Sequence, residues 1–340
     1  MPAITKPNLH FDVRARAGNG VSPSAVVTDL NFTPNLVWTK QRDAINYHII
    51  ADNISRSNVA AFLSSNATDA DNTASGGGWY QSFDTNGYTT RAGSSDSANV
   101  NKSGVTYVDW VWKGGGTAVT NTTGTISAQV SANPTAGFSI VSYTHNGTNA
   151  ATVGHGLGVT PSFIINKQRS AIANWRCYHV SLTAGYNIQL NLTSTQGTAG
   201  DIFQTAPTSS VFTPGNGDSA SGQTMVAYCF APIAGYSAFG SYTGNGSADG
   251  TFVYLGFRPK WMLIKRLATE SWLIADSLRD PYNAVTNYLL ANTTGAEASG
   301  VSYDFVSNGI KFRANSQNES AATYIYAAFA EAPFKYANAR

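Results

Sequence analysis

Three short segments share a spacing of bulky apolar positions that is typical of a β-strand. Each begins with Thr and carries two bulky apolar residues four positions apart, which lie on one face because successive side chains of a strand point to opposite faces. We expect that face to pack in the core. The opposite face varies between Asp109, Ala227 and Tyr326, as expected of a surface exposed to solvent or to another domain. The segments are TYVDWVW from Thr106, TMVAYCF from Thr224 and TYIYAAF from Thr323, with Val108, Val226 and Ile325 and then Trp112, Phe230 and Phe329 on the core face.

A second pattern recurs three times with unchanged spacing. A Leu lies four residues before a Pro, and a Lys lies six residues after it. The positions that follow the Pro, such as Leu36-Val37-Trp38, are apolar at both parities, which indicates a central strand covered on both sides. The repeated positions are Pro34 and Lys40, Pro161 and Lys167, and Pro259 and Lys265.

The order of these patterns predicts the architecture. An Asn-Gly pair precedes each Leu-Pro-Lys segment, and this pair favours a tight type I′ hairpin turn. Short strands, frequent turn residues and the lack of a sustained helical period indicate an all-β chain. Because the series occurs three times, we expect three tandem β-sandwich domains of a jelly-roll or lectin-like kind, derived from an internal triplication. The expected units cover residues 8–118 (the most divergent), 137–236 and 237–337, and a linker rich in Gly, Thr and Ser covers 119–136.

Composition changes this picture in one respect, the nature of the surface. Hydrophobic residues make up 42% of the chain but charged residues only 12%, about half of the usual share. The formal net charge is +2, and the Lys and Arg residues are dispersed, so we expect no nucleic-acid binding. The sequence has no run of about 18 apolar residues, and its first residues lack the apolar stretch of a signal peptide. We therefore expect no membrane insertion and synthesis in a cytoplasm.

The residue types that most often carry chemistry show no spacing that indicates a site. The five His residues lack paired ligand spacing, and the two cysteines, Cys177 and Cys229, are expected to be small buried apolar groups. Gly217-Asp218-Ser219 is similar to the surroundings of a serine nucleophile, but its place in the series indicates a turn. The glycine-rich stretch from Gly154 to Gly158 precedes a strand instead of a phosphate-binding helix. We expect no catalytic residue, no metal, no cofactor and no enzyme activity.

The repeated lysines allow two interpretations. Their recurrence in copies that need not share a ligand favours a structural role, in which the aliphatic stem is buried and the ammonium group pairs with an Asp. The alternative is that the three lysines form three equivalent ligand sites. The residues at the matching downstream position are Asp52 in the first copy and Asp276 in the third, with His179 in the second.

Aromatic residues make up 12% of the chain, and several lie outside the expected core positions, in loops rich in Asn, Asp and Gly. Such residues suit stacking on sugar rings, and they equally suit contacts between subunits. The sequence leaves both interpretations open. The candidate surface residues are Trp79, Tyr80, Tyr186, Tyr282 and Tyr303.

The third unit contains the segments SYTGNG, GFRPKWMLIKR, DPYNAVTNYLLAN, FVSNGI and the terminal TYIYAAFAEAPFKYANAR. Through these segments it resembles a repeat domain of structural proteins of tailed bacteriophages, which are tail-fibre-like or uncharacterised virion proteins. The resemblance is closest over 237–340, weaker over 137–236 and weakest over 1–118. It implies a location in the virion after assembly in the cytoplasm of the bacterial host, and it transfers no catalytic residue.

These observations predict a virion structural protein, foremost a tail-fibre or tail-associated surface component that contributes to host attachment. A capsid decoration or vertex protein is the alternative, because the sequence shows no helical stalk. A glycan-degrading tail-spike enzyme is disfavoured, since the Asp residues lie mostly at turns. The expected partners are other virion proteins, further copies of the chain in a homotrimer, and a glycan of the host surface.

Overall fold

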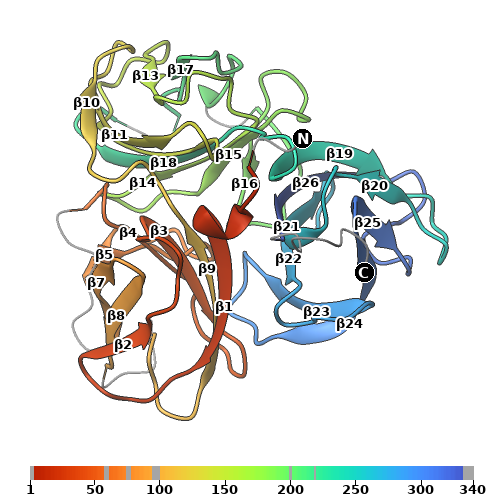
Figure 1. Cartoon of the computed structure of the whole chain (residues 1–340). Coiled ribbons are helices and arrows are strands. Elements are labelled where there is room, and N and C mark those ends of the chain that lie inside the picture. Colours follow the sequence, from red (N-terminus) through yellow and green to blue (C-terminus); the bar gives the residue numbers. More distant parts are fainter. Residues whose placement is uncertain are drawn as a thin grey trace.

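The computed structural model describes residues 4–56, 61–73, 78–93, 100–198, 201–217 and 220–331. Three β-rich lobes surround a common centre, and the chain passes through them in order (Figure 1). Lobe 1 comprises residues 4–118, lobe 2 residues 119–236 and lobe 3 residues 237–331. Within the described ranges the only helix is the short 3-10 turn η1 (Pro7–Leu9), which confirms that the chain is all-β.

Each lobe is built on four antiparallel strands in the same order of neighbours, and we call these the inner strands. The first strand of a lobe pairs with its last long strand, which pairs with the strand that follows the repeated Pro, which pairs with a shorter strand. In lobe 1 they are β1 (Phe11–Ala17), β9 (Thr106–Trp112), β3 (Leu36–Gln41) and β4 (Ile49–Asp52). In lobe 2 they are β12 (Phe138–Thr144), β18 (Thr224–Phe230), β14 (Phe163–Gln168) and β15 (Arg176–His179), and in lobe 3 β19 (Ser237–Thr243), β26 (Thr323–Ala330), β21 (Pro259–Arg266) and β22 (Leu273–Asp276).

The pairing register of the inner strands is also the same in the three lobes. The spacing from Pro to Lys that recurs in the sequence therefore corresponds to one position in three sheets. The repeated prolines are buried at or shortly before the start of their strands, where a missing N–H leaves the hydrogen-bond ladder intact. Lys40 lies opposite Val108, Lys167 opposite Val226, and Lys265 opposite Ile325.

The inner faces of all three lobes form one shared hydrophobic cluster. Phe329 of lobe 3 stacks on Phe11 of lobe 1, with 5.0 Å between the ring centroids, and its ring lies 5.9 Å from that of Phe230 of lobe 2. Because these side chains leave water only when all three lobes are present, the inner faces form a core that no lobe has by itself. The cluster contains the predicted core positions Val108, Trp112, Val226, Phe230, Ile325 and Phe329, which confirms their face.

A second layer covers the outer face of the inner strands, so that each lobe is sandwich-like and has a small core of its own. Leu36 and Trp38 belong to the shared cluster and Val37 to the outer core of lobe 1, which confirms a central strand covered on both sides. In lobe 1 the layer consists of β2 (Ser24–Val27), β8 (Gly87–Arg91) and β7 (Trp79–Asp84), with β5 (Ala61–Phe62) and β6 (Asn72–Thr73). Lobe 2 has β13 (Val153–Gly154) and β17 (Val211–Phe212), besides β16 (Ile188–Gln189) next to β15; lobe 3 has β23 (Val285–Leu290), β24 (Ala298–Val306), β25 (Gly309–Phe312) and β20 (Phe252–Tyr254).

The expectation that the opposite face of the closing strands is exposed is wrong. Asp109 and Ala227 are fully buried and Tyr326 is half-buried. The second layers cover this face, and the alternation within one strand carries no information about them.

The segment predicted as a linker over 119–136 is also different in the structure. It contains β10 (Val119–Asn121) and β11 (Ala128–Asn133), which pair in series onto β12 and extend the sheet of lobe 2 to seven strands. Ala128 and Val130 point into the outer core of this lobe. A segment rich in small polar residues becomes a strand here because the edge of β12 supplies hydrogen-bond partners.

The Asn-Gly pairs upstream of the repeated prolines do not close hairpins. The Oδ1 atom of each Asn accepts the N–H of the residue two positions on, which is an Asx turn, and the chain then enters the second layer. The hairpins lie at the later Asn-Gly pairs, where Asp84 is opposite Gly87 and Val306 opposite Gly309. The Asx turns join Asn19 to Val21, Asn146 to Thr148 and Asn245 to Ser247.

Candidate functional site

The lobes meet at three seams, which we name seam 3–1, seam 1–2 and seam 2–3 after the lobes that they join. At each seam a buried lysine of one lobe donates to a backbone carbonyl of the preceding lobe around the centre. Lys40 Nζ donates to Gln41 O at 2.9 Å and to Thr294 O of lobe 3 at 3.2 Å. The corresponding contacts join Lys167 to Thr68 of lobe 1 at 3.1 Å and Lys265 to Thr193 of lobe 2 at 3.3 Å.

The predicted pairing of these lysines with Asp52 and Asp276 is wrong. Both carboxylates lie at the other end of the inner strands, Asp52 opposite Leu36 and Asp276 opposite Trp261. Burial disfavours the ammonium form and lowers the pKa of Lys40 and of Lys265 to about 8. The inter-lobe contacts support the structural interpretation of the lysines, with carbonyl oxygens as their partners.

Ring nitrogens form a second set of seam contacts. Trp175 Nε1 donates to Ser64 O of lobe 1 at 2.8 Å, and Trp272 Nε1 donates to Gln189 O of lobe 2 at 2.9 Å. The same position in lobe 1 is His48, whose Nδ1 accepts from the Trp38 indole at 2.8 Å. The proton of the neutral ring is therefore on Nε2, which donates to Leu290 O of lobe 3 at 3.0 Å.

An asparagine holds each of these rings in place. Its Oδ1 accepts the backbone N–H of the ring residue, and it opens an Asn-x-Thr triplet whose Thr carbonyl accepts from the seam lysine. The sequence thus contains a signal for the seams in three triplets that lie outside the Leu-Pro-Lys pattern. The asparagines and the ring residues whose backbone N–H they accept are Asn66 with His48, Asn191 with Trp175 and Asn292 with Trp272.

Asp52 is the centre of a buried polar cluster at seam 1–2. Its carboxylate accepts from Arg56 Nη1 at 2.6 Å and from Tyr228 Oη of lobe 2 at 2.8 Å. Burial alone would raise the pKa of Asp52, but the Arg56 guanidinium and the hydrogen bonds to the carboxylate outweigh it and lower this pKa. Arg56 also forms an ion pair with Asp71 at 2.9 Å, and Asp71 forms a second ion pair with Arg169 of lobe 2 at 2.7 Å.

Seam 3–1 contains the same sequence of charges. Asp276 accepts from Arg279 Nε at 2.6 Å and from the Trp110 indole of lobe 1 at 3.1 Å. Arg279 also donates to Glu297 at 2.8 Å. The same carboxylate accepts two hydrogen bonds from the guanidinium group of Arg42 in lobe 1, at 2.7 and 3.1 Å. Such bidentate pairs are directional as well as strong, so they favour one alignment of the two lobes.

Seam 2–3 is different in polarity. His179 replaces the Asp, accepts the Ser181 N–H on Nδ1 at 3.2 Å, and donates from Nε2 to Tyr326 O of lobe 3 at 3.1 Å. Leu267 and Gln196 stand where the other seams have Arg and an acid. Among the described residues, the ion pairs that join two lobes lie at the other two seams. Seam 2–3 is the one between lobes that residues 231–236 connect directly.

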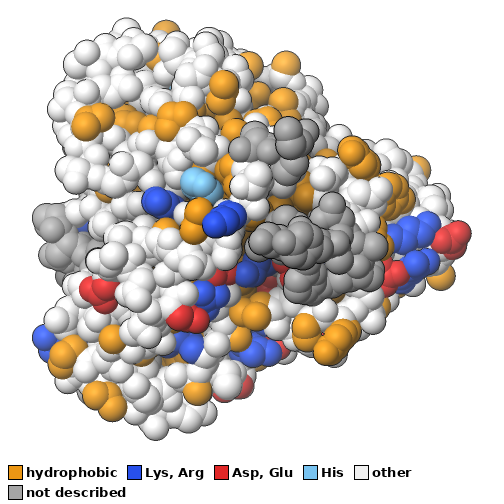
Figure 2. Space-filling view, viewed as in Figure 1, with side chains coloured by type: hydrophobic (Ala, Val, Ile, Leu, Met, Phe, Trp, Pro, Cys, Tyr) orange, Lys and Arg blue, Asp and Glu red, His pale blue; other side chains and the backbone are white. Residues whose placement is uncertain are grey.

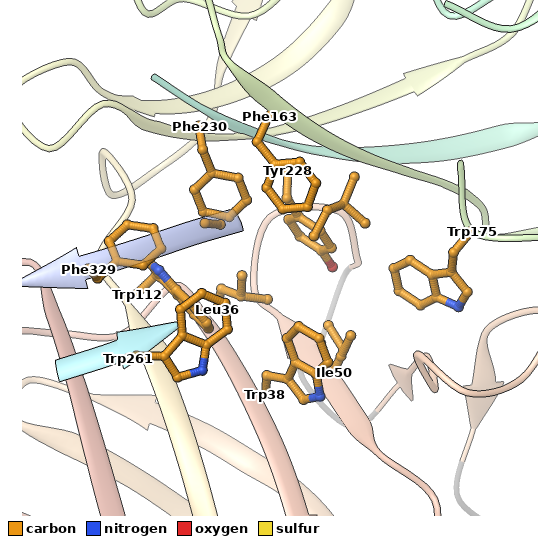
Figure 3. Close-up of a pocket in the computed structure, with 12 residues that line it drawn as sticks. Leu36, Trp38, Ile50, Trp112, Phe163, Trp175, Tyr228, Phe230, Trp261 and Phe329 are labelled. Carbon is orange, nitrogen blue, oxygen red and sulfur yellow. The ribbon is translucent and has the colours of Figure 1, made fainter. Parts of the chain in front are cut away.

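A small cavity lies where the three lobes meet (Figure 3). Trp38 of lobe 1, Phe163 of lobe 2 and Phe329 of lobe 3 are among its lining residues, all of which are apolar or aromatic. The space open to the centre of a water molecule is about 20 Å³. Because no nitrogen or oxygen atom forms part of its surface, this cavity offers no acid, base or nucleophile to a substrate.

A separate polar cluster lies between the two layers of lobe 1. The Asp109 carboxylate accepts from Arg16 Nε at 2.6 Å, from Tyr88 Oη at 2.6 Å and from Thr39 Oγ1. Burial and the nearby Asp109 charge raise the pKa of Tyr88 well above its usual value. Since the carboxylate is fully buried, the cluster links the layers and does not face a substrate.

The structure divides the candidate surface aromatics. Tyr282 is 84% exposed, whereas Trp79 and Tyr186 are half-buried. The surface assignment of Tyr80 and Tyr303 is wrong, because both are fully buried in the outer cores of lobes 1 and 3. Each lies on a strand, β7 or β24, that the sequence patterns did not identify as a second layer.

Exposed apolar residues and a scarcity of charge characterise the surface of lobe 2. Figure 2 shows that this lobe, uppermost in the view, presents polar uncharged and apolar side chains with almost no charged ones on this face. Ile172 of lobe 2 is 75% exposed, and Ile45, at the equivalent place in lobe 1, is 78% exposed. Both lie between a seam lysine and its ring residue.

No constellation typical of catalysis or metal binding is present in the described part of the chain. No three His, Cys, Asp or Glu residues there group to hold a metal ion, and Cys177 and Cys229 are free and buried as predicted. Gly156 and Gly158 adopt positive φ in the loop between β13 and β14. Asp218 and Ser219 of the Gly-Asp-Ser triplet lie outside the described residues. No helix within the described ranges is long and apolar enough to span a membrane.

Comparison with known protein families gives a match over most of the chain. A family described as Domain of unknown function (DUF7483) matches residues 6–333. No curated protein and no solved structure matches the chain. The match covers all three lobes, so the family's domain corresponds to the whole three-lobed body.

Proposed function

The chain belongs to the DUF7483 family, and we propose that it is a non-enzymatic structural component of a bacteriophage virion, associated with the tail and contributing to host attachment. One observation carries the non-enzymatic part: the buried charged groups at the seams join one lobe to another. Arg42 and Arg169 reach across to acids of a neighbouring lobe. The cavity between the lobes is wholly apolar.

We further infer that the three lobes derive from an internal triplication, with units near residues 8–118, 137–236 and 237–337. Equal strand order, equal register and equal seam contacts support this inference. A shared inner core joins the three fused units, which suits a rigid platform for surface loops.

The surface supports recognition by contacts other than charge. The exposed ring of Tyr282 is free to stack on a sugar or to enter a subunit contact, and lobe 2 presents few charges (Figure 2). Binding to a host-surface glycan should therefore depend little on salt, because screening acts on charged pairs.

Immunogold labelling of purified phage particles tests the location. We expect label on the tail. Label on the capsid would replace the tail assignment by a decoration or vertex role, and unlabelled particles, with labelled protein in the lysate, would overturn the virion proposal.

Incubation with purified host-envelope polysaccharide tests the activity. We expect binding without the release of reducing ends, weakened in Tyr282→Ala and retained in Tyr282→Phe, which keeps the ring. Release of oligosaccharides would overturn the non-enzymatic assignment, and unchanged binding by Tyr282→Ala would remove this residue from the contact.

Mass measurement in solution tests self-association. A homotrimer would present nine such lobes and gain affinity for a repeated glycan through effective concentration. A single-chain mass at micromolar concentration would contradict the homotrimer.

A further inference from the structure

The cavity at the centre of the molecule has an identifiable origin in the sequence. Trp110 of lobe 1 and Tyr228 of lobe 2 occupy one position of the closing strand, opposite Trp38 and Ile165. The third lobe has Ala327 at this position, opposite Leu263. The side chain in lobe 3 is therefore small where the equivalent side chains of the other two lobes are large. The neighbouring rings do not fill the space that remains beside it (Figure 3).

The polar atoms of the lining residues are turned away from this space. Trp38 Nε1 donates to His48, Trp175 Nε1 to Ser64 O, and Tyr228 Oη to Asp52. The indole N–H groups of Trp112 and Trp261 are buried without an acceptor, but neither nitrogen forms part of the cavity surface. A water molecule in a buried site needs two to four polar partners. It would find none here, so water is a poor occupant of the cavity.

The volume sets the size of a better occupant. The space open to the centre of a water-sized sphere is about 20 Å³, so the cavity holds at least one sphere of that size. Apolar cavities of this type stay dry and accept xenon or small hydrocarbons. We propose that the cavity is a binding site for a small apolar ligand of the size of xenon or a two-carbon hydrocarbon.

The site lies where the three lobes meet, so a bound ligand would stabilise the contacts between all of them. A ligand would contact Trp38 of lobe 1, Phe163 of lobe 2 and Phe329 of lobe 3 together. Because the three walls come together only in the folded chain, a ligand binds the folded state alone and stabilises it by an amount that grows with the logarithm of its free concentration above Kd. This site is independent of the surface contacts proposed above.

Xenon is the probe that tests the proposal. We expect 129Xe NMR of the purified protein to show saturable binding, and crystals pressurised with xenon to show one atom in the cavity. We also expect the melting temperature to rise under xenon pressure. Ordered water in the cavity, or the absence of xenon there, would overturn the proposal.

Two variants assign the signal to this cavity. Ala327→Leu fills it and should lose xenon binding, whereas Ala220→Leu makes the same change at an exposed position and should retain it. Should Ala327→Leu fail to fold, Ile50→Val removes a methylene from the lining and should bind xenon more tightly than the natural protein. Unchanged xenon binding in Ala327→Leu, or weaker binding in Ile50→Val, would contradict the assignment.

Discussion

Tyr228 donates a 2.8 Å hydrogen bond to the carboxylate of Asp52, although 176 positions separate the two residues in the chain. The bond joins the closing strand of lobe 2 to β4 of lobe 1 inside a fully buried cluster. Trp110 and Asp276 form the equivalent contact at seam 3–1. At seam 2–3 the donor position is Ala327, and the acid is replaced by His179, which donates to the main chain instead. Donor and acceptor thus change together.

Tyr228→Phe should lower the free energy of unfolding by about 2 kcal/mol, because a hydrogen bond to a charged group is lost and the carboxylate stays buried. Urea unfolding at neutral pH measures this. Tyr254→Phe is the matched control, since Tyr254 is 68% exposed, and it should be neutral. Equal effects of the two changes would show that the Tyr228 bond contributes nothing.

Phe230→Ala should lower the free energy of unfolding by about 3–5 kcal/mol, the usual cost of emptying an aromatic core site. Its ring contacts Phe138 and Phe163 of its own lobe, Trp112 of lobe 1 and Phe329 of lobe 3. Chemical denaturation with one probe in each lobe would measure the change. Phe252→Ala, at a position 45% exposed, should cost much less. A loss below about 0.5 kcal/mol for Phe230→Ala would contradict a shared core.

Lys40 should make stability rise with pH. Its pKa is about 8 in the fold, against 10.5 as the ordinary value, so between these values the unfolded chain binds more protons and unfolding becomes harder as the pH increases. Between pH 8 and 9.5 we expect the stability of the natural protein to gain about 1.5 kcal/mol relative to Lys40→Met, which cannot titrate. The comparison between variants removes the contribution of the cysteines and tyrosines.

Lys6→Met is the control for this experiment, because Lys6 is exposed. Its stability should follow that of the natural protein at every pH. Parallel pH profiles for Lys40→Met and the natural protein would contradict a lowered pKa for Lys40.

His179 should make the protein sensitive to acid. Burial lowers its pKa to about 4, against 6.5 as the ordinary value, so the neutral ring stabilises the fold above pH 6.5 and this stabilisation is lost as the pH falls toward 4. The expected loss from this residue by pH 4 is about 2–3 kcal/mol. His179→Gln keeps a donor for Tyr326 O without the titration, and its stability should fall less on acidification. An identical acid transition in both proteins would exclude His179 as a cause.

The sequence alone determined the three closing strands and which of their faces packs in the shared core. Side chains alternate with a period of two in a strand, so the spacing of Val108 and Trp112 predicts that they lie on one face, without any knowledge of the rest of the chain. The unchanged interval from Pro to Lys likewise predicted which positions would be equivalent, and Lys40, Lys167 and Lys265 do occupy one register. These features depend on residues close together in the sequence, so their spacing is enough to predict them.

The tertiary structure alone decided what those faces meet. Asp52 was expected to pair with Lys40 but pairs with Arg56 and Tyr228, because the two ends of the inner strands lie at different seams, Lys40 at seam 3–1 and Asp52 at seam 1–2. Residues 119–136 became strands, and Tyr80 and Tyr303 became core residues, since neighbouring edges and layers supplied hydrogen bonds and apolar contacts. Such partners lie up to 255 positions away, as Arg42 and Glu297 do. A pattern that repeats over a few residues contains no information on contacts at that distance.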